Sequence, residues 1–265
     1  RLSRTAHADA IGAAGGDLPA GETHLDVALG LFDRRKAGEH SRIHGMHPWV
    51  AGLCNSGRLQ WFGGRADEAL DRCRRGLALA RELRHPVQLA YALSVTAAVH
   101  TCRDEPAEAL DLVQELRRLA AGDTLPYWVA WASTLGGWAN AMLGRDETGL
   151  AELREALDRY RSTGAGVFEP WSLGLLAQVH AAAGRSEQAL AALESALANP
   201  MLADGYFFGA ELYRIKGQLL LETTNDRSMA LRCVRYALQM ARAQGAKVFE
   251  ERANALLVNC LGETR

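Results

Sequence analysis

The stretch Gly64-Arg65-Ala66-Asp67-Glu68-Ala69-Leu70 recurs along the chain with its small residue and its leucine kept in place. The copies are Asp104–Leu110, Gly144–Leu150, Gly184–Leu190 and, more weakly, Asn225–Leu231. The small residue falls at positions 69, 109, 149, 189 and 230, so the period is 40 or 41 residues. A fixed period of this size is typical of a solenoid built from stacked helical units.

Each residue type in this stretch has a structural role. The glycine can end the preceding helix in a left-handed conformation, and Asp67 and Glu68 fall in the first turn of the next helix, where the helix dipole favours acids. The small residue allows two helices to approach closely, and the leucine enters the core. Small residues also recur twelve positions earlier, at Gly57, Ala97, Gly137 and Ala177. The motif is therefore interpreted as a packing device rather than as a catalytic or binding signature.

The repeat predicts an all-α, TPR-like right-handed α-solenoid of helix pairs of about 40 residues. First helices are expected at 49–62, 87–102, 126–143, 168–183 and 205–222, and second helices at 66–84, 106–121, 146–163, 186–198 and 227–244. Proline at or near the start of several first helices supports these boundaries. The whole of 1–265 is treated as one repeat domain: a degenerate pair at 1–32, an irregular loop at 33–47, five pairs at 48–245 and a capping helix at 246–265.

Composition limits the functional classes. The formal net charge of -1 gives no bulk attraction to nucleic acid or to an anionic membrane, so neither is expected as a partner. No apolar run is long enough to span a bilayer, and the first residues lack the apolar region of a signal peptide. The five scattered cysteines are typical of free thiols in a reducing compartment, which predicts a cytoplasmic protein.

The helix pair, with small residues at these two places and Gly-x-x-x-Glu-Ala just inside the second helix, resembles the tetratricopeptide repeat. Gly64–Glu82, Ala210–Leu221 and Ala237–Glu251 are more specifically similar to the C-terminal repeats of bacterial STAND-type signalling ATPases, which often carry a cyclase domain. That resemblance implies a larger parent protein with an upstream ATPase or nucleotide cyclase, and we expect this chain to be a part of one. The chain itself contains no G-x-x-x-x-G-K-[S/T] phosphate-binding loop.

Aligning the repeats places side chains of the first helices on one expected concave surface. The candidate binding residues are Arg58, Tyr91, Ser94, Trp131, Thr134, Trp138, Trp171, Gln178, Glu211 and Arg214. Tyr91, Trp131 and Trp171 are 40 residues apart and could form an aromatic stripe in an open groove, because aromatic and arginine side chains dominate binding hot spots. The alternative is that these rings pack between neighbouring helices.

Other residues give weaker indications. His40, His44 and His47 have a spacing that could suit a metal ion, but no carboxylate or cysteine completes a convincing ligand set, so no metal or cofactor is expected. The arginines of 72–84 are interpreted as a solvated surface rather than a nucleic-acid patch. No nucleophile motif is present, so the chain is not expected to be an enzyme.

Two functions remain open. The first is a non-catalytic module that binds a protein, a peptide or another domain of its own chain in the groove. The second is a small-molecule sensor closed by the His40–His47 loop, and a catalytic site in the groove is a remote third. A long open groove would favour the peptide binder, whereas a closed pocket with convergent polar groups would favour the sensor.

Overall fold

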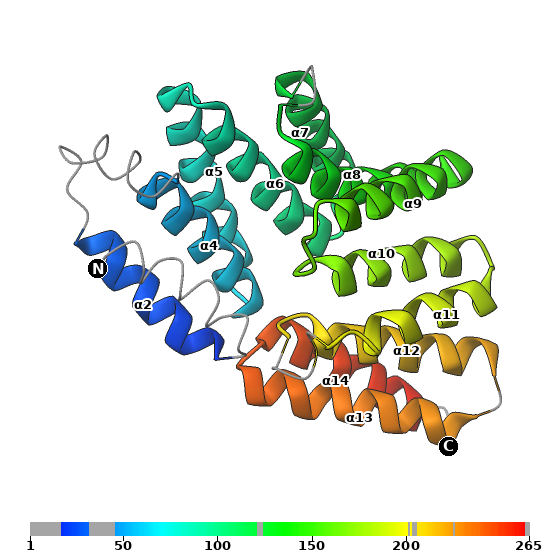
Figure 1. Ribbon diagram of the computed structural model, residues 1–265. Coiled ribbons are helices and arrows are strands. Elements are labelled where there is room, and N and C mark those ends of the chain that lie inside the picture. The colour runs from blue at the N-terminus through cyan, green and yellow to red at the C-terminus, as the bar shows by residue number, and fades with distance from the viewer. Residues whose placement is uncertain are drawn as a thin grey trace.

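The computed structural model describes residues 17–31, 46–120, 124–200, 202, 206–224 and 226–262. Within these ranges the chain forms twelve helices and no strand. The expected helix at the start of the chain and most of the loop 33–47, with His40 and His44, lie outside the described residues. The all-α, TPR-like solenoid predicted from the repeat is confirmed for the rest (Figure 1).

The helices follow the predicted order and agree with the expected boundaries to within a few residues. The first helices of the pairs are α4 (Pro48–Phe62), α6 (Pro86–Cys102), α8 (Pro126–Met142), α10 (Glu169–Ala182) and α12 (Gly209–Thr223). The second helices are α5 (Ala66–Leu83), α7 (Pro106–Leu119), α9 (Asp146–Ser162), α11 (Ser186–Leu197) and α13 (Arg227–Gln244). They are preceded by α2 (Leu18–Gly30) and followed by α14 (Lys247–Gly262).

The turns within the pairs have the conformation that the sequence predicts. Gly64, Gly144 and Gly184 have φ of 87°, 79° and 70°, in the left-handed region that favours glycine. The second copy has Asp104 at this position, with φ of 63°, in keeping with the tolerance of aspartate for this region. The helix starts also match, since proline stands in the first turn of α4, α6 and α8.

The small residues of the motif bring the two helices of a pair into close contact. A Cβ added to Gly137 of α8 would lie 2.6 Å from the backbone nitrogen of Leu153 and 2.8 Å from the carbonyl oxygen of Gly149, both on α9. A Cβ on Gly57 of α4 would lie 2.7 Å from the carbonyl oxygen of Ala69 on α5. The repeating small residues therefore set the helix spacing, as the sequence predicts.

The first helices form an inner layer that closes on itself. Each contacts the next, from α4 through α6, α8 and α10 to α12, then α12 contacts α14, and α14 returns to α4. At the junction, the Cβ of Lys247 lies 3.5 Å from the Cβ position of Gly64, and the ring of Pro19 meets Gly245. Figure 1 shows the start of α2 beside the turn between α13 and α14. The predicted capping helix α14 thus also occupies the place of a sixth inner helix.

Candidate binding pocket

A pocket of about 460 Å³ lies on the inner side of this ring. Its walls come from the end of α6 and from α10, α12 and α14, which are brought together by the closure. The lining residues are Thr101, Cys102, Asp104, Trp171, Leu175, Gln178, Phe208, Glu211, Arg214, Gln218, Arg252, Ala255, Leu256 and Asn259. The lining therefore combines apolar and aromatic groups with amide and charged groups, a mixture typical of ligand sites.

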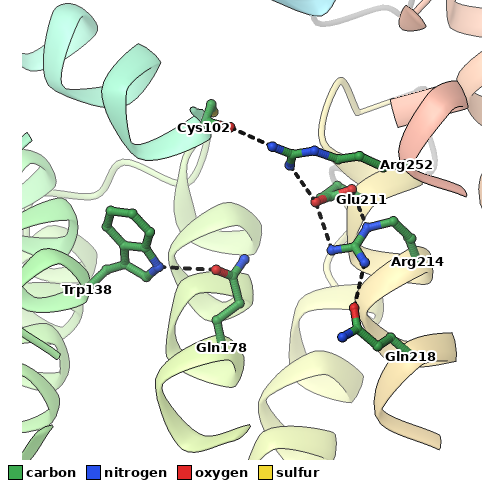
Figure 2. Close-up of polar contacts among 7 residues, drawn as sticks. All are labelled: Cys102, Trp138, Gln178, Glu211, Arg214, Gln218 and Arg252. Carbon is green, nitrogen blue, oxygen red and sulfur yellow. Dashed lines mark hydrogen bonds and ion pairs between the residues drawn. The ribbon is translucent and has the colours of Figure 1, made fainter. Parts of the chain in front are cut away.

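Glu211 organises the charged part of the lining (Figure 2). Its carboxylate accepts hydrogen bonds from Arg214 Nε and Nη2, at 2.8 and 3.0 Å, and from Arg252 Nη1, at 2.9 Å. Arg252 also donates through Nη2 to the carbonyl oxygen of Cys102, at 2.8 Å. Its guanidinium carbon lies 5.5 Å from the ring centroid of Trp61. A single arginine of α14 therefore reaches α12, α6 and α4.

The electrostatics of Glu211 follow from this arrangement. Burial acts to raise the pKa of its carboxyl, but the charges and hydrogen bonds of Arg214 and Arg252 outweigh burial and leave the pKa below its ordinary value. Only 2% of the Glu211 side chain is exposed, whereas 16% of Arg214 and 37% of Arg252 are. Glu211 is thus a buried anion held by two arginines that face the pocket.

Amide side chains extend the polar lining along the inner helices. Trp138 Nε1 of α8 donates to Gln178 Oε1 of α10, at 3.1 Å, and Arg214 Nη1 donates to Gln218 Oε1, at 2.7 Å (Figure 2). Trp138, Gln178 and Gln218 occupy the same position in successive repeats. Gln178 and Gln218 of this register line the pocket, whereas Trp138 is buried.

The predicted open aromatic stripe is wrong. Trp131 is only 1% exposed and Trp171 only 2% exposed, and only Tyr91 is partly exposed. Trp131 stacks on Phe168 at 4.0 Å between ring centroids, and Trp171 packs 5.3 Å from Phe208. Because the inner helices pack against one another around the ring, these aromatic side chains fill the spaces between them, and a pocket takes the place of the expected long groove.

The other predicted site residues divide into two groups. Ser94, Thr134 and Trp138 are also buried, so the expectation that they line an open surface is wrong. The two hydroxyls bond instead to carbonyl oxygens of their own helices, those of Ala90 and Trp131. The second group, Trp171, Gln178, Glu211 and Arg214, meets in the pocket lining. Tyr91 and Arg58 belong to neither group: both are partly buried elsewhere on the inner helices.

Sequence reasoning missed the contribution of α14. Arg252, Ala255 and Asn259 line the pocket, but a helix interpreted only as a cap supplies no binding residues. The available signal was the register, because Glu251 follows Glu211 by 40 residues and so continues the series of first helices.

The pocket lining contains one cysteine, Cys102. Burial raises the pKa of the Cys102 thiol to about 12, which keeps the sulfur in its poorly nucleophilic protonated form.

Among the described residues no cluster of three or more histidine, cysteine or acidic side chains could hold a metal ion. His47, the member of the predicted histidine set that is described, donates through its backbone nitrogen to Gln88. In the same part of the chain no helix has the length and apolarity needed to cross a membrane.

Comparison with known proteins by sequence gives two matches. Residues 128–200 match the tetratricopeptide repeat family. The chain is 24% identical over 235 residues to the uncharacterized protein R02095 of Rhizobium meliloti (strain 1021), covering 86% of this chain and 22% of that protein. It therefore spans about a fifth of the length of this curated relative.

Comparison by structure gives similar folds at low identity. A Rap protein complexed with competence and sporulation factor superposes with a TM-score of 0.69 and 10% identity, over 82% of this chain and 61% of that one. The Rap conjugation gene regulator of the plasmid pLS20, in complex with the Phr* peptide, superposes with a TM-score of 0.68 and 14% identity, over 97% of this chain and 78% of that one. Together with the repeat, these similarities establish the fold as an all-α, TPR-like solenoid.

Proposed function

We propose that this chain is a non-catalytic regulatory module that binds a short peptide segment in the inner pocket, the segment belonging to a partner protein or to another domain of the same parent chain. The observation that carries the proposal is the convergence of Gln178, Arg214 and Arg252 with apolar groups in one pocket. The similarity in fold to the plasmid regulator solved with a peptide is consistent with it. The raised pKa of the partly buried Cys102 thiol argues against this cysteine as a nucleophile, which is consistent with a non-catalytic role.

Because the pocket exists only when the ring is closed, ligand binding would be coupled to closure of the ring. Its walls belong to α6, α10, α12 and α14, and α14 also contacts α4. A ligand that touches all four walls binds the closed ring better than an open one, and so shifts the population toward closure. In the parent protein that shift would control an upstream ATPase or nucleotide cyclase, in keeping with the resemblance of the repeats to signalling ATPases.

The ion pairs of the outer surface and the state of the cysteines are consistent with the proposed partner and compartment. The arginines of the outer helix α5 are largely matched by acids, as in the ion pairs Arg72–Asp26, Arg75–Asp71 and Arg81–Glu115. This balance is the argument against nucleic acid as a partner. Cys54, Cys73, Cys102 and Cys233 form no disulfide, which is in keeping with a cytoplasmic protein.

The test uses a variant that fills the pocket. Ala255 lines the pocket and is exposed, so Ala255→Trp should block it while leaving the core unchanged. The matched control is Ala151→Trp, at an exposed position of the outer helix α9. The chain is incubated with a pool of synthetic random hexapeptides, and the peptides retained after gel filtration are identified by mass spectrometry. Wild type and Ala151→Trp should retain the same peptides and Ala255→Trp should lose them; equal retention by all three contradicts the pocket.

A second candidate function, a small-molecule sensor, is favoured by the size of the pocket. About 460 Å³ falls within the range of roughly 300–1,000 Å³ that is usual for small-ligand sites. The same three proteins are therefore also incubated with a filtered small-molecule extract of a bacterial lysate. Pocket-dependent retention of an extract compound, with no retention of any hexapeptide, would replace the peptide proposal with the sensor.

A further inference from the structure

The inner helix α4 carries an arginine that has no acidic partner among the described residues. Arg58 lies on α4, and its Nη2 donates a long hydrogen bond of 3.4 Å to Asn55 Oδ1. Its guanidinium carbon lies 5.4 Å from the ring centroid of Phe207. Its Nε is buried and has no hydrogen-bond partner among the described residues. No ion pair of Arg58 is found in that part of the chain, although the residue is partly buried.

Several other partly buried arginines of the chain do have acidic partners. Arg214 and Arg252 share Glu211, Arg103 pairs with Glu105, and Arg117 pairs with Glu152. A guanidinium does not lose its proton in a protein, so it cannot relieve burial by becoming neutral. Withdrawing it from water without a partner is unfavourable. The unmatched charge of Arg58 therefore indicates a place that an anion would stabilise.

Arg58 is linked to the pocket by its repeat position and by its charge. It occupies on α4 the repeat position that Trp138, Gln178 and Gln218 occupy on later inner helices, and the two glutamines line the pocket. One turn further along α4, Trp61 packs against the guanidinium of Arg252. Burial raises the pKa of the pocket residue Cys102, and the charges of Arg252 and Arg58 oppose that rise, so the charge of Arg58 is felt at the pocket wall.

Two further donors without partners lie along the same row of rings. Trp131 Nε1 and Trp171 Nε1 are buried and make no hydrogen bond among the described residues. Aromatic contacts connect Trp171 through Phe208, at 5.3 Å, and Phe207, at 6.3 Å, to Arg58. Buried polar groups are normally satisfied, so these two indole N–H groups mark a part of the interior that is short of hydrogen-bond acceptors.

The charge balance indicates a single negative charge. In the pocket lining the two arginines, Arg214 and Arg252, are matched by the two acids, Glu211 and Asp104. Arg58 then adds one positive charge that remains unmatched. A carboxylate carries one negative charge and fits the planar fork of a guanidinium, whereas a phosphate carries more charge than this single arginine matches.

We infer that Arg58 anchors a carboxylate of the bound peptide, either its C-terminal carboxylate or that of an Asp or Glu side chain. This inference rests on the proposed peptide binding and adds the chemical class of the ligand. The peptide lies across the inner face of the ring, with its carboxylate at the guanidinium on the α4 side and the rest of the segment toward α10, α12 and α14.

The test compares Arg58→Gln with Arg81→Gln, a control on the exposed surface of α5, and with Arg58→Lys, which keeps the charge. Three hexapeptide pools are used: one with free C termini, one amidated, and one amidated without Asp and Glu. Wild type and Arg81→Gln should retain carboxylate-bearing peptides at least tenfold better than Arg58→Gln, and Arg58→Lys should be intermediate. The amidated pools identify which carboxylate binds. Equal retention by Arg58→Gln and wild type overturns the inference while leaving the proposed peptide binding intact.

A second measurement decides the case in which wild type retains no peptide and the proposed function fails. Melting temperatures are measured at constant ionic strength in sodium chloride, acetate and phosphate, with circular dichroism confirming that each variant is folded. Acetate should raise the Tm of wild type and of Arg81→Gln relative to chloride, and should not raise that of Arg58→Gln. An equal rise in Arg58→Gln overturns the anion site, and a larger Arg58-dependent rise in phosphate than in acetate overturns the carboxylate assignment.

Discussion

The inner and outer helices of this solenoid obey the same repeat and bury their side chains differently. The outer helix α9 buries one face, with Leu150, Leu153 and Leu157, and exposes the rest. The inner helix α8 is buried through most of its length, including Trp131 and the polar Thr134. The inner helix α8 is covered by the outer helices α7 and α9 and by its inner neighbours α6 and α10. A position that faces inward is therefore exposed only where the side chains leave a pocket.

The largest expected effect concerns the charge cluster of the inner layer. Glu211→Gln keeps the shape of the side chain but leaves Arg214 and Arg252 without their shared anion, so we expect a loss of about 3 kcal/mol in the free energy of unfolding. The outer control is Glu115→Gln, which breaks the exposed pair with Arg81 and should cost less than about 1 kcal/mol. Urea denaturation measures both. Equal losses of unfolding free energy in the two variants would contradict the claim that the inner charge cluster contributes more to stability than the exposed outer pair.

The same cluster predicts an acid-sensitive contribution to stability. The pKa of Glu211 is lowered in the folded chain, so its contribution is fully present above the unfolded value of about 4.3 and is lost as the pH falls through the lowered folded value. Wild type should therefore lose more stability than Glu211→Gln between about pH 5.5 and pH 3. Urea midpoints across this range provide the measurement, and parallel curves for the two proteins would show that Glu211 does not titrate as described.

A smaller effect is expected where the two layers touch. Gly137→Ala places a Cβ 2.6 Å from the backbone of α9, so the helices must separate, at a cost of about 1–3 kcal/mol. Gly166→Ala is the control, because no atom lies within 4 Å of its added Cβ. The control should keep or slightly raise the urea midpoint. A tolerated Gly137→Ala would mean that the layers are not held at this spacing.

The smallest effect is expected along the polar lining. Trp138→Phe removes the indole donor to Gln178 and leaves most of the packing, so it should destabilise by about 1 kcal/mol. Adding Gln178→Ala to Trp138→Phe should then cost less than Gln178→Ala alone, as a double-mutant cycle measures. Fully additive losses would show that the two side chains do not stabilise each other.

The repeat predicted much of the fold because its residues act locally. Gly64, Gly144 and Gly184 end helices by their own conformation, and the small residues fix the spacing within a pair. The register also predicted that Gln178, Glu211 and Arg214 lie on one surface.

Closure of the ring could not be predicted in the same way. It depends on the small rotation that each repeat adds, which the period does not encode. Because the sequence does not indicate that the ring closes, it predicted an exposed stripe that includes Trp131 and Trp171, and it predicted that α14 only caps the solenoid. The same closure brings Arg252 to Glu211 and to the Cys102 carbonyl, which is 150 positions away in the sequence.

Closure of the inner ring is the central claim, and one engineered disulfide tests it most directly. The Cβ positions of residues 64 and 247 lie 3.5 Å apart, within the range of about 3.5–4.5 Å that a disulfide requires. The double variant Gly64→Cys, Lys247→Cys should form this bond under mild oxidation, as seen by mass spectrometry and by the loss of two maleimide-reactive thiols. Neither single variant should form it. If both new thiols stay fully reactive in the folded chain, the solenoid is open and the account is wrong.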